Sequence, residues 1–311
     1  MDVIWLDAQN TCDPREVGSK AAGLLRLLRL GFLVPRGFVV TASAFQKFLD
    51  GLGLTSKLDV LPKCTREDEL EPKMRHIQGV IEAGVLPEGV KHSIGIAYKT
   101  LGGKVAVRSS GNLEDTEQSA FAGAYASFLN RTGEKEVLDA IRDCWNSAFS
   151  PKVVAYRLQH GLIGGDWLMG VIVQTMVDAN KAGVMFTRNP FGERDTILVE
   201  AVSGGCDRIV SGAPADLSVR IDWTTRKAEY VKQAPSVLRR FGTGAVGLLG
   251  DNSEQSPKLL RRREIDALVN VAVRLEDALH QPQDVEWAIA DGQLILLQTR
   301  PLTGYSMINR R

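Results

Sequence analysis

Cysteine is scarce in this 311-residue chain, and no two cysteines lie close together. Cys12, Cys64, Cys144 and Cys206 form no CxxC pair, which argues against a disulfide framework and against a structural zinc site. The start of the chain lacks a basic segment followed by an apolar one, and no apolar run approaches the roughly 20 residues of a membrane-spanning helix. We therefore expect a cytoplasmic protein with reduced thiols.

Net charge is nearly absent as well, because 38 Lys and Arg balance 37 Asp and Glu. The formal charge of +1 provides no global field that would attract nucleic acid or an anionic membrane. Any anion must be bound by local placement of Lys and Arg, so the expected ligand is a small molecule. The run Arg261 to Arg263 begins a predicted helix and is more typical of a solvated face than of a nucleic-acid site.

Hydrophobic periodicity divides the chain into two parts. The first part predicts helices over 19–31, 42–50, 66–82, 88–101, 136–148 and 151–159, strands over 37–41 and 104–110, and a connection over 51–66. The second part predicts strands over 167–177, 184–190, 196–202, 217–223 and 227–233, then a helix that starts near Ser256 and Pro257, and a closing hairpin. The pattern indicates an α/β or α+β protein with two lobes, 1–165 and 166–303, and a tail over 304–311.

The closing hairpin, DVEWAIADGQLILLQTRP over 284–301, carries polar residues where an apolar pattern would suffice. Its turn signal is Asp291-Gly292. Alternation places Asp284 and Glu286 on one face of the first strand, and Gln298 and Arg300 on one face of the second. Trp287 points the other way and is expected in the core.

Five segments together resemble one known family. They are VGSKAAGLLRLLRLGFLVPRGFVVT, VAVRSSGNLEDTEQSAFAGAYASFLN, VIVQTMVDANKAGVMFTRNP, VEAVSGGCDRIVSGAPAD and QDVEWAIADGQLILLQTRPLT. In this order, between about Glu16 and Thr303, they resemble the amino-terminal ATP-binding domain of the phosphoenolpyruvate synthase and pyruvate phosphate dikinase family, which also includes rifampin phosphotransferase. The resemblance implies an ATP-grasp fold whose two lobes clamp Mg-ATP in a cleft. In that family ATP donates its β-phosphoryl group to a histidine on a separate domain, and AMP is released.

Two cations of the first lobe are candidates for phosphate contacts. Lys20 lies in the first turn of its helix, where the helix dipole disfavours a cation, so it is either a solvated surface lysine or the neighbour of an anion. The resemblance makes it a phosphate contact, although relatives usually have Gly at the position of Ser19. Arg108 ends a strand and could pair with Glu114 or Asp115, or direct its guanidinium at phosphate oxygens. The resemblance favours the polyphosphate.

The loop 111–125 contains SAFAGAY, Ser119–Tyr125. This segment is either an ordinary surface loop or, by the resemblance, the mobile segment that closes over the phosphates. If the segment closes over the phosphates, Gly123 would allow the backbone to approach the phosphates closely.

The adenine site is implied by the strand VIVQTMV. Gln174 is either an amide satisfied in the core or part of this adenine edge. The resemblance implies that backbone groups from Thr175 to Val177 pair with the base, and that Met176 packs against it. Glu200 resembles an acid that contacts the nucleotide. The following run has Gly-Gly-Cys-Asp over 204–207 where relatives have Gly-Leu-Gly-Glu, which leaves the loop geometry and the role of Asp207 open.

The resemblance assigns the hairpin to magnesium and to transfer. Glu286 and the Gln298 carbonyl form a plausible Mg²⁺ half-site, since this ion prefers hard oxygen ligands. Arg300 would neutralise developing phosphate charge, as would Lys20 and Arg108. Asp284 could orient Arg300.

The turn at Asp291-Gly292 constrains this assignment. With a plain two-residue turn Val285, not Glu286, would lie opposite Gln298, and the two ligands would face opposite ways. We therefore predict an odd-length turn or a β-bulge.

A partner domain or subunit is expected. None of His76, His92, His160 and His280 lies in the Thr-Ser-His setting of the family's phosphohistidine carrier, and the resemblance uses nearly the whole chain. The function implied is an ATP-dependent, dikinase-type phosphotransferase component, stand-alone as in phenylphosphate synthase or part of a longer enzyme. One alternative is a nucleotide-sensing or interaction module without transfer activity. Another is a direct small-molecule kinase that forms ADP. The final acceptor and the oligomeric state stay open.

Overall fold

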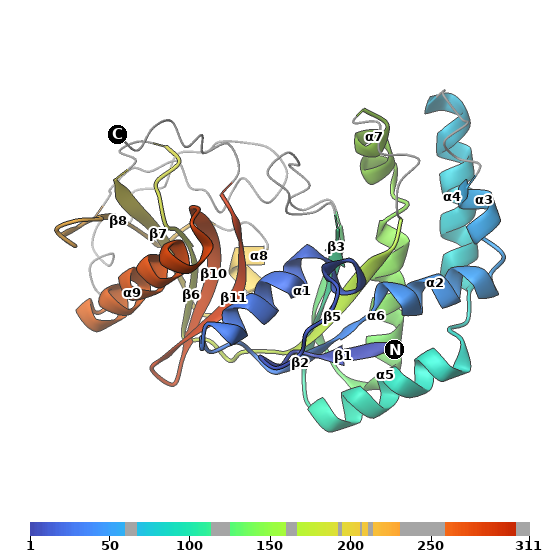
Figure 1. The fold of residues 1–311 in the computed structure, drawn as a ribbon, viewed down its shortest axis with the longest axis horizontal. Coiled ribbons are helices and arrows are strands. Elements are labelled where there is room, and N and C mark those ends of the chain that lie inside the picture. Colours follow the sequence, from blue (N-terminus) through green and yellow to red (C-terminus); the bar gives the residue numbers. More distant parts are fainter. Residues whose placement is uncertain are drawn as a thin grey trace. The chain divides into compact units, whose positions relative to one another are not determined.

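The computed structural model describes residues 1–59, 67–112, 125–159, 167–191, 195–205, 207–210, 214–230 and 259–302. These residues form two compact units (Figure 1). The first contains the described residues of 1–26, 36–114 and 121–176, and the second those of 27–35 and 177–311. The predicted boundary at residue 165 falls before a strand that pairs within the first sheet, so the first unit continues to Met176.

The elements alternate helix and strand in the first unit and are mainly strands in the second. In chain order they are β1 (Val3–Trp5), α1 (Pro14–Arg29), β2 (Gly37–Val40), α2 (Ala42–Gly51), α3 (Thr55–Asp59), α4 (Glu67–Ala83), α5 (Glu88–Leu101), β3 (Val105–Gly111), β4 (Ser127–Arg131), α6 (Gly133–Ser147), α7 (Pro151–Gln159), β5 (Met169–Thr175), β6 (Lys181–Phe186), β7 (Thr196–Ser203), α8 (Asp207–Val210), β8 (Leu217–Asp222), β9 (Ala228–Tyr230), α9 (Arg262–Leu279), β10 (Gln283–Ala290) and β11 (Gln293–Pro301).

The first unit is built on a five-stranded antiparallel sheet with the order β1-β2-β5-β3-β4. Alternation gives each strand one apolar face, and residues such as Phe38, Val107 and Val173 pack from that face into a core filled by helices. In this core the rings of Phe45 and Trp145 stack with centroids 4.9 Å apart.

Helix α1 is fixed to the opposite face of the first sheet by a close backbone contact. Gly18 interrupts the helix with φ 78° and ψ 168°. A Cβ atom there would lie 1.7 Å from the carbonyl oxygen of Ser110, and a Cβ on Gly170 would lie 2.4 Å from that of Val17. The helix was predicted to begin at Ser19. It begins at Pro14 and is broken at Gly18, because only glycine permits this conformation and this approach.

The second unit is built on a six-stranded antiparallel sheet with the order β11-β10-β6-β7-β8-β9. Helix α9 lies across one face of this sheet (Figure 1) and packs on β10 and β11. Trp287 is fully buried, as predicted, and its ring lies over Gly183, where a Cβ atom would be 2.4 Å from the indole.

Ionic contacts hold the first turn of α9. Glu264 accepts hydrogen bonds from the Arg261 N–H at 2.7 Å and from Lys181 Nζ at 2.7 and 2.8 Å. Burial alone would raise the pKa of Glu264, but the hydrogen bonds from Lys181 and Arg261 outweigh it and lower the pKa below its usual value. The run Arg261 to Arg263 is exposed, as predicted.

The fold class is confirmed as helices with antiparallel sheets, although the first unit also has a sheet of its own. Several short elements were not predicted: β1, β4, α8, and α3, which lies inside the predicted connection 51–66. They are too short for a periodic pattern to show. The strand predicted over 184–190 spans Lys181–Phe186, and the predicted helix start at Ser256 lies outside the described residues. Over the described ranges, no helix has the length and apolar character needed to cross a membrane.

We expect Gly18→Ala to lower the free energy of unfolding by at least about 3 kcal/mol, because it adds a severe overlap with Ser110 to an unfavourable φ. Gly53→Ala is the matched control: its φ is 62° but nothing lies within 4 Å of the added Cβ, so it should cost only about 1–2 kcal/mol. Urea unfolding measures both. Equal losses in the two variants would show that the Gly18–Ser110 contact is unimportant.

Candidate functional site

Of the two predicted alternatives, an odd-length turn or a β-bulge, the closing hairpin contains the bulge. A two-residue turn at Asp291-Gly292 pairs Ala290 with Gln293, and this register continues to Trp287 opposite Leu296. The register then shifts, so that Glu286 pairs with Gln298 and Leu297 is the extra residue. Directly opposite residues of an antiparallel pair project to the same face. The bulge thus places the Glu286 and Gln298 side chains on one face of the sheet.

The same row of the sheet continues through three more strands. Glu286 pairs with Val184, Val184 with Glu200, and Glu200 with Ser218. Because neighbouring strands lie about 4.8 Å apart, the Cα atoms of Glu286 and Glu200 are separated by about 10 Å, with Val184 between them. Gln298, Glu200 and Ser218 are buried, and Glu286 is half-buried. Ser218 was not predicted, since a serine in an alternating strand gives no signal of its own.

Arg300 and Asp284 form an ion pair in the adjacent row. They are direct partners across β10 and β11, and Arg300 Nε and Nη2 donate to Asp284 Oδ2 at 2.9 and 2.8 Å. The exposed fractions of the two side chains are only 18% and 7%. Such a pair fixes the plane of the guanidinium. The prediction that Asp284 orients Arg300 is confirmed in this geometric sense.

A patch of small apolar side chains borders the polar row. Ala182, Val184, Val202 and Ala288 form one buried cluster, against which Val177 and Leu297 pack. Ala288 pairs with Ala182, and Ala182 with Val202, so these residues share the face of Glu286 and Glu200.

Oxygen donors on this face could hold a divalent cation. Among the described residues no three His, Cys, Asp or Glu side chains gather into a metal-binding group. A carboxylate facing a carboxamide, Glu286 with Gln298, supplies two hard oxygen ligands. This set fits Mg²⁺, which usually takes one or two protein ligands and completes its shell with phosphate oxygens and water.

In the first unit, Lys20 lies beside the end of β3. Lys20 Nζ donates to the Ser109 carbonyl at 3.3 Å, and the neighbouring Ser19 Oγ donates to the Gly111 carbonyl at 2.8 Å. The Ala21 N–H donates to Ser110 Oγ at 3.0 Å. The segments GSKA and SSG, far apart in the sequence, are thereby joined.

Arg108 and Gln174 lie on the face of the first sheet that carries α1. Arg108 is two residues from Ser110 along β3, or about 7 Å, and projects to the same face. Gln174 is buried opposite Ala106 on that face, beside Gly37, where a Cβ atom would be 2.7 Å from Gln174 Cγ. The first sheet thus brings Lys20, Arg108 and Gln174 to one face.

The segment from Thr175 to Val177 passes from the first unit to the second. The N–H groups of Thr175 and Met176 donate to the carbonyls of Arg36 and Lys104, each at 2.9 Å. Of the backbone groups predicted to pair with a base, the N–H groups of Thr175 and Met176 are therefore already hydrogen-bonded. Within the described part of the chain, the Met176 carbonyl and the Val177 N–H have no hydrogen-bond partner.

Gly123 and most of the loop 111–125 lie outside the described residues. Asp207 begins α8 and is exposed, and the neighbouring Arg208 pairs with Asp216 at 2.6 Å. This ion pair fastens α8 to the start of β8.

The chain resembles known proteins along nearly its whole length. Residues 14–310 match the family described as "Pyruvate phosphate dikinase, AMP/ATP-binding domain". The chain is 37% identical to a probable phosphoenolpyruvate synthase of Archaeoglobus fulgidus, over 97% of this chain and 42% of that protein. It is 35% identical to a probable phosphoenolpyruvate synthase of Methanothermobacter thermautotrophicus, over 92% of this chain and 44% of that protein. The chain thus spans less than half the length of these curated relatives.

Among solved structures, PH1788 of Pyrococcus horikoshii Ot3 is similar over 68% of this chain and 80% of that chain, with 15% identity and a TM-score of 0.36.

The register of the hairpin can be tested by cross-linking. The double variant Glu286→Cys/Gln298→Cys should form a disulfide under mild oxidation, because opposite residues have Cα atoms about 4.5–5.5 Å apart. Val285→Cys/Gln298→Cys is the matched control and should stay reduced, since its side chains project to opposite faces. Peptide mass mapping distinguishes the new disulfide from pairings of the native cysteines. Cross-linking of the control pair alone would show that the bulge is absent in solution.

Proposed function

Since the chain belongs to the pyruvate phosphate dikinase family of AMP/ATP-binding domains, we propose that it is an ATP-dependent phosphotransferase component that binds Mg-ATP. It passes the β-phosphoryl group of ATP to a histidine of another domain or polypeptide with AMP as the leaving group, and the γ-phosphoryl group is transferred to water and leaves as inorganic phosphate. The observation that carries this proposal is the bulged hairpin, which aligns Glu286, Gln298, Asp284 and Arg300 on one face of the second sheet.

Magnesium binding is assigned to Glu286 and the side-chain carbonyl of Gln298. When bound, the ion would neutralise charge on the phosphate oxygens. Glu286 supplies a formal negative charge, while Gln298 adds an oxygen ligand without a further charge. The bulge at Leu297 is therefore a requirement of the metal site.

Arg300 acts on the phosphoryl group that is transferred. Phosphoryl transfer depends mainly on positioning and on stabilising charge at the phosphate oxygens. Asp284 holds the guanidinium of Arg300 through two hydrogen bonds. A cation fixed in this way need not reorganise during the reaction, which is the source of electrostatic catalysis.

The base and the remaining phosphates have their own candidates. The Met176 carbonyl is assigned to the amino group of adenine. The Val177 N–H belongs to the same trans peptide group and points the opposite way, so it is not assigned to this edge of the base. Val177 also packs against the small apolar patch, and we assign this patch to the adenine ring. Lys20 and Arg108 on the first sheet are assigned to the polyphosphate, and Glu200 to the rest of the nucleotide.

A phosphohistidine carrier is the proposed partner. The relatives are more than twice as long as the region they share with this chain, so the acceptor histidine is assigned to a part outside that region. Incubation with a phosphohistidine domain of a relative should produce AMP from ATP and label that domain from [β-³²P]ATP. Formation of ADP instead would contradict the proposal.

Arg300→Ala should reduce phosphoryl transfer by about 100- to 1000-fold, because it removes charge stabilisation from the transition state. Transfer of label to the carrier domain measures the effect. The variant removes the Arg300 guanidinium from Asp284, so urea unfolding must show that the protein is still folded at the assay temperature. Arg262→Ala, at an exposed ion pair with Asp266, is the control and should transfer normally. Normal transfer by Arg300→Ala would exclude the proposed role.

Glu286→Gln should raise the magnesium concentration needed for half-maximal ATP binding by at least about tenfold, since it removes the charged ligand but keeps the side-chain shape. Calorimetric titration of ATP at several magnesium concentrations measures this shift. Glu88→Gln, an exposed residue of α5, is the matched control. A magnesium dependence that stays the same in Glu286→Gln would rule out this ligand.

A further inference from the structure

A buried polar network lies on the side of the second sheet opposite the Asp284–Arg300 pair. Its members are Thr187, Arg188, Glu276, Gln283 and Thr299, and we name it the back-face network. Thr187, Glu276, Gln283 and Thr299 are each at most 8% exposed. Buried polar groups of this kind are costly unless all are hydrogen-bonded. Their bonds therefore constrain the backbone that carries them.

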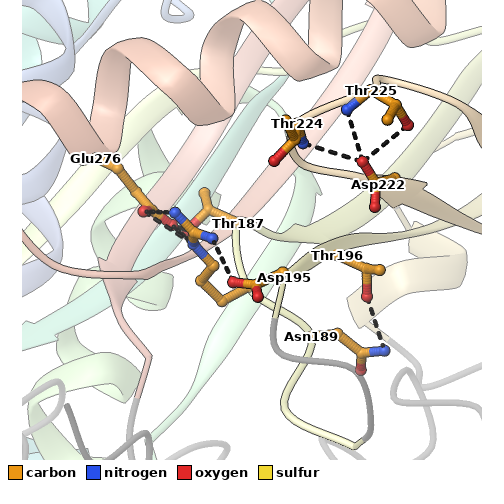
Figure 2. A network of polar contacts seen from close by, with 9 residues as sticks. Thr187, Asn189, Asp195, Thr196, Asp222, Thr224, Thr225 and Glu276 are labelled. Atoms are coloured by element: carbon orange, nitrogen blue, oxygen red, sulfur yellow. Dashed lines mark hydrogen bonds and ion pairs between the residues drawn. The ribbon is translucent and has the colours of Figure 1, made fainter. Parts of the chain in front are cut away.

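Helix α9 contributes the charged centre of this network. Glu276 accepts hydrogen bonds from Arg188 Nε at 3.1 Å to each carboxylate oxygen, and Arg188 Nη2 lies 3.0 Å from Glu276 Oε2. The Arg188 guanidinium also lies over the Trp223 ring, 3.8 Å from its centroid. These contacts tie the end of α9 to the segment that follows β6 (Figure 2).

Thr187 connects this charged centre to the hairpin. Its hydroxyl donates to Glu276 Oε1 at 2.7 Å (Figure 2). The same hydroxyl oxygen accepts from the Gln283 N–H at 2.8 Å. The Thr187 N–H donates to the Gln283 carbonyl at 2.9 Å. The first residue of β10 is thus held by both its backbone groups.

Gln283 carries the connection on to β11. Its Oε1 accepts from Thr299 Oγ1 at 3.1 Å, and its Nε2 donates to the carbonyls of Gln281 and Pro282, each at 3.1 Å. The partner of Gln283 across the ladder is Pro301, which has no N–H to donate. Both backbone groups of Gln283 bond to Thr187, so the side-chain bond to Thr299 adds a link between β10 and β11 at this position.

The bond between Gln283 and Thr299 crosses directly behind the Asp284–Arg300 pair. Gln283 precedes Asp284 on β10, and Thr299 precedes Arg300 on β11, while Asp284 and Arg300 pair with one another. Successive residues of a strand project to opposite faces. Asp284 and Arg300 are thus each preceded by a residue whose side chain is hydrogen-bonded on the other side of the sheet.

We propose that the back-face network is a positioning device for Arg300, with Thr299 as the positioning residue next to it. The network holds the Cα atoms of Asp284 and Arg300 at the spacing that their ion pair requires. Because Glu276 lies on α9 and accepts a hydrogen bond from Thr187, this spacing also depends on how α9 packs against the sheet. The proposal rests on the function proposed above for Arg300, but its geometric part can be tested without phosphoryl transfer.

The first test follows the Arg300 side chain in the whole chain by ¹H–¹⁵N NMR of arginine Nε–H groups, with the signal assigned by its loss in Arg300→Lys. In Thr299→Val, which keeps the side-chain shape, hydrogen exchange of the Arg300 Nε–H should accelerate by about tenfold, as expected when one hydrogen bond is lost. Thr299→Ser should restore slow exchange. Thr196→Val is the matched control, because Thr196 is a buried threonine of the same sheet that bonds to Asn189 outside the network. Unchanged exchange in Thr299→Val would overturn the proposal.

The second test measures transfer to a carrier domain. Thr299→Val should lower kcat by about 10- to 100-fold with little change in KM for Mg-ATP, since a small displacement affects the transition state most. In the Arg300→Ala background the same substitution should have no further effect, because the two residues act as one unit. An equal loss in both backgrounds would overturn the positioning role. If the wild-type chain transfers nothing, the proposed function fails, and the exchange measurement still decides whether Thr299 positions Arg300.

Discussion

One extra residue in β11 governs the candidate site. Without the bulge at Leu297, the tight turn at Asp291-Gly292 would pair Val285 with Gln298 and send the proposed metal ligands to opposite faces. The bulge is compatible with packing because Leu297, which is partly buried, packs against the small apolar patch. A single hairpin thereby combines a two-residue turn with two proposed metal ligands on one face. The pairing of Asp284 with Arg300 depends on the same register shift.

Both units follow the same physical scheme. In each, one face of an antiparallel sheet packs against helices in an apolar core, and the opposite face, which in the first unit also carries α1, holds the polar residues proposed to contact the nucleotide. Apolar side chains on the helix-covered face drive folding, so the opposite face is released to carry Lys, Arg, Glu and Gln. Close backbone approach at Gly18 and Gly170 then brings Lys20 to the end of β3. Stability and chemistry are thus assigned to different faces of the same strands.

The back-face network is an exception to this division. It places an Arg–Glu pair and three polar side chains among apolar groups under α9, where a purely apolar core would pack more cheaply. Its position behind Asp284 and Arg300 gives these polar groups a function in addition to stability. A hydrogen-bonded network has only one satisfied geometry, whereas apolar side chains accept several arrangements. Such a network therefore suits a place where a cation must be held in one orientation.

The hairpin turn and the buried Trp287 could be predicted from local pattern, and the family from five segments along the chain. The resemblance to that family, together with the spacing of polar residues in the hairpin, required an odd-length turn or a β-bulge. The contacts between residues far apart in the chain could not be predicted. Nothing local indicates that Ser110 lies against Gly18, that Ser218 extends the row of Glu200, or that Thr187 and Glu276 brace Thr299. These contacts join residues far apart in the chain, and they exist only after strands have paired and helices have packed. Periodicity records which face of an element is apolar, but only folding decides which two faces meet.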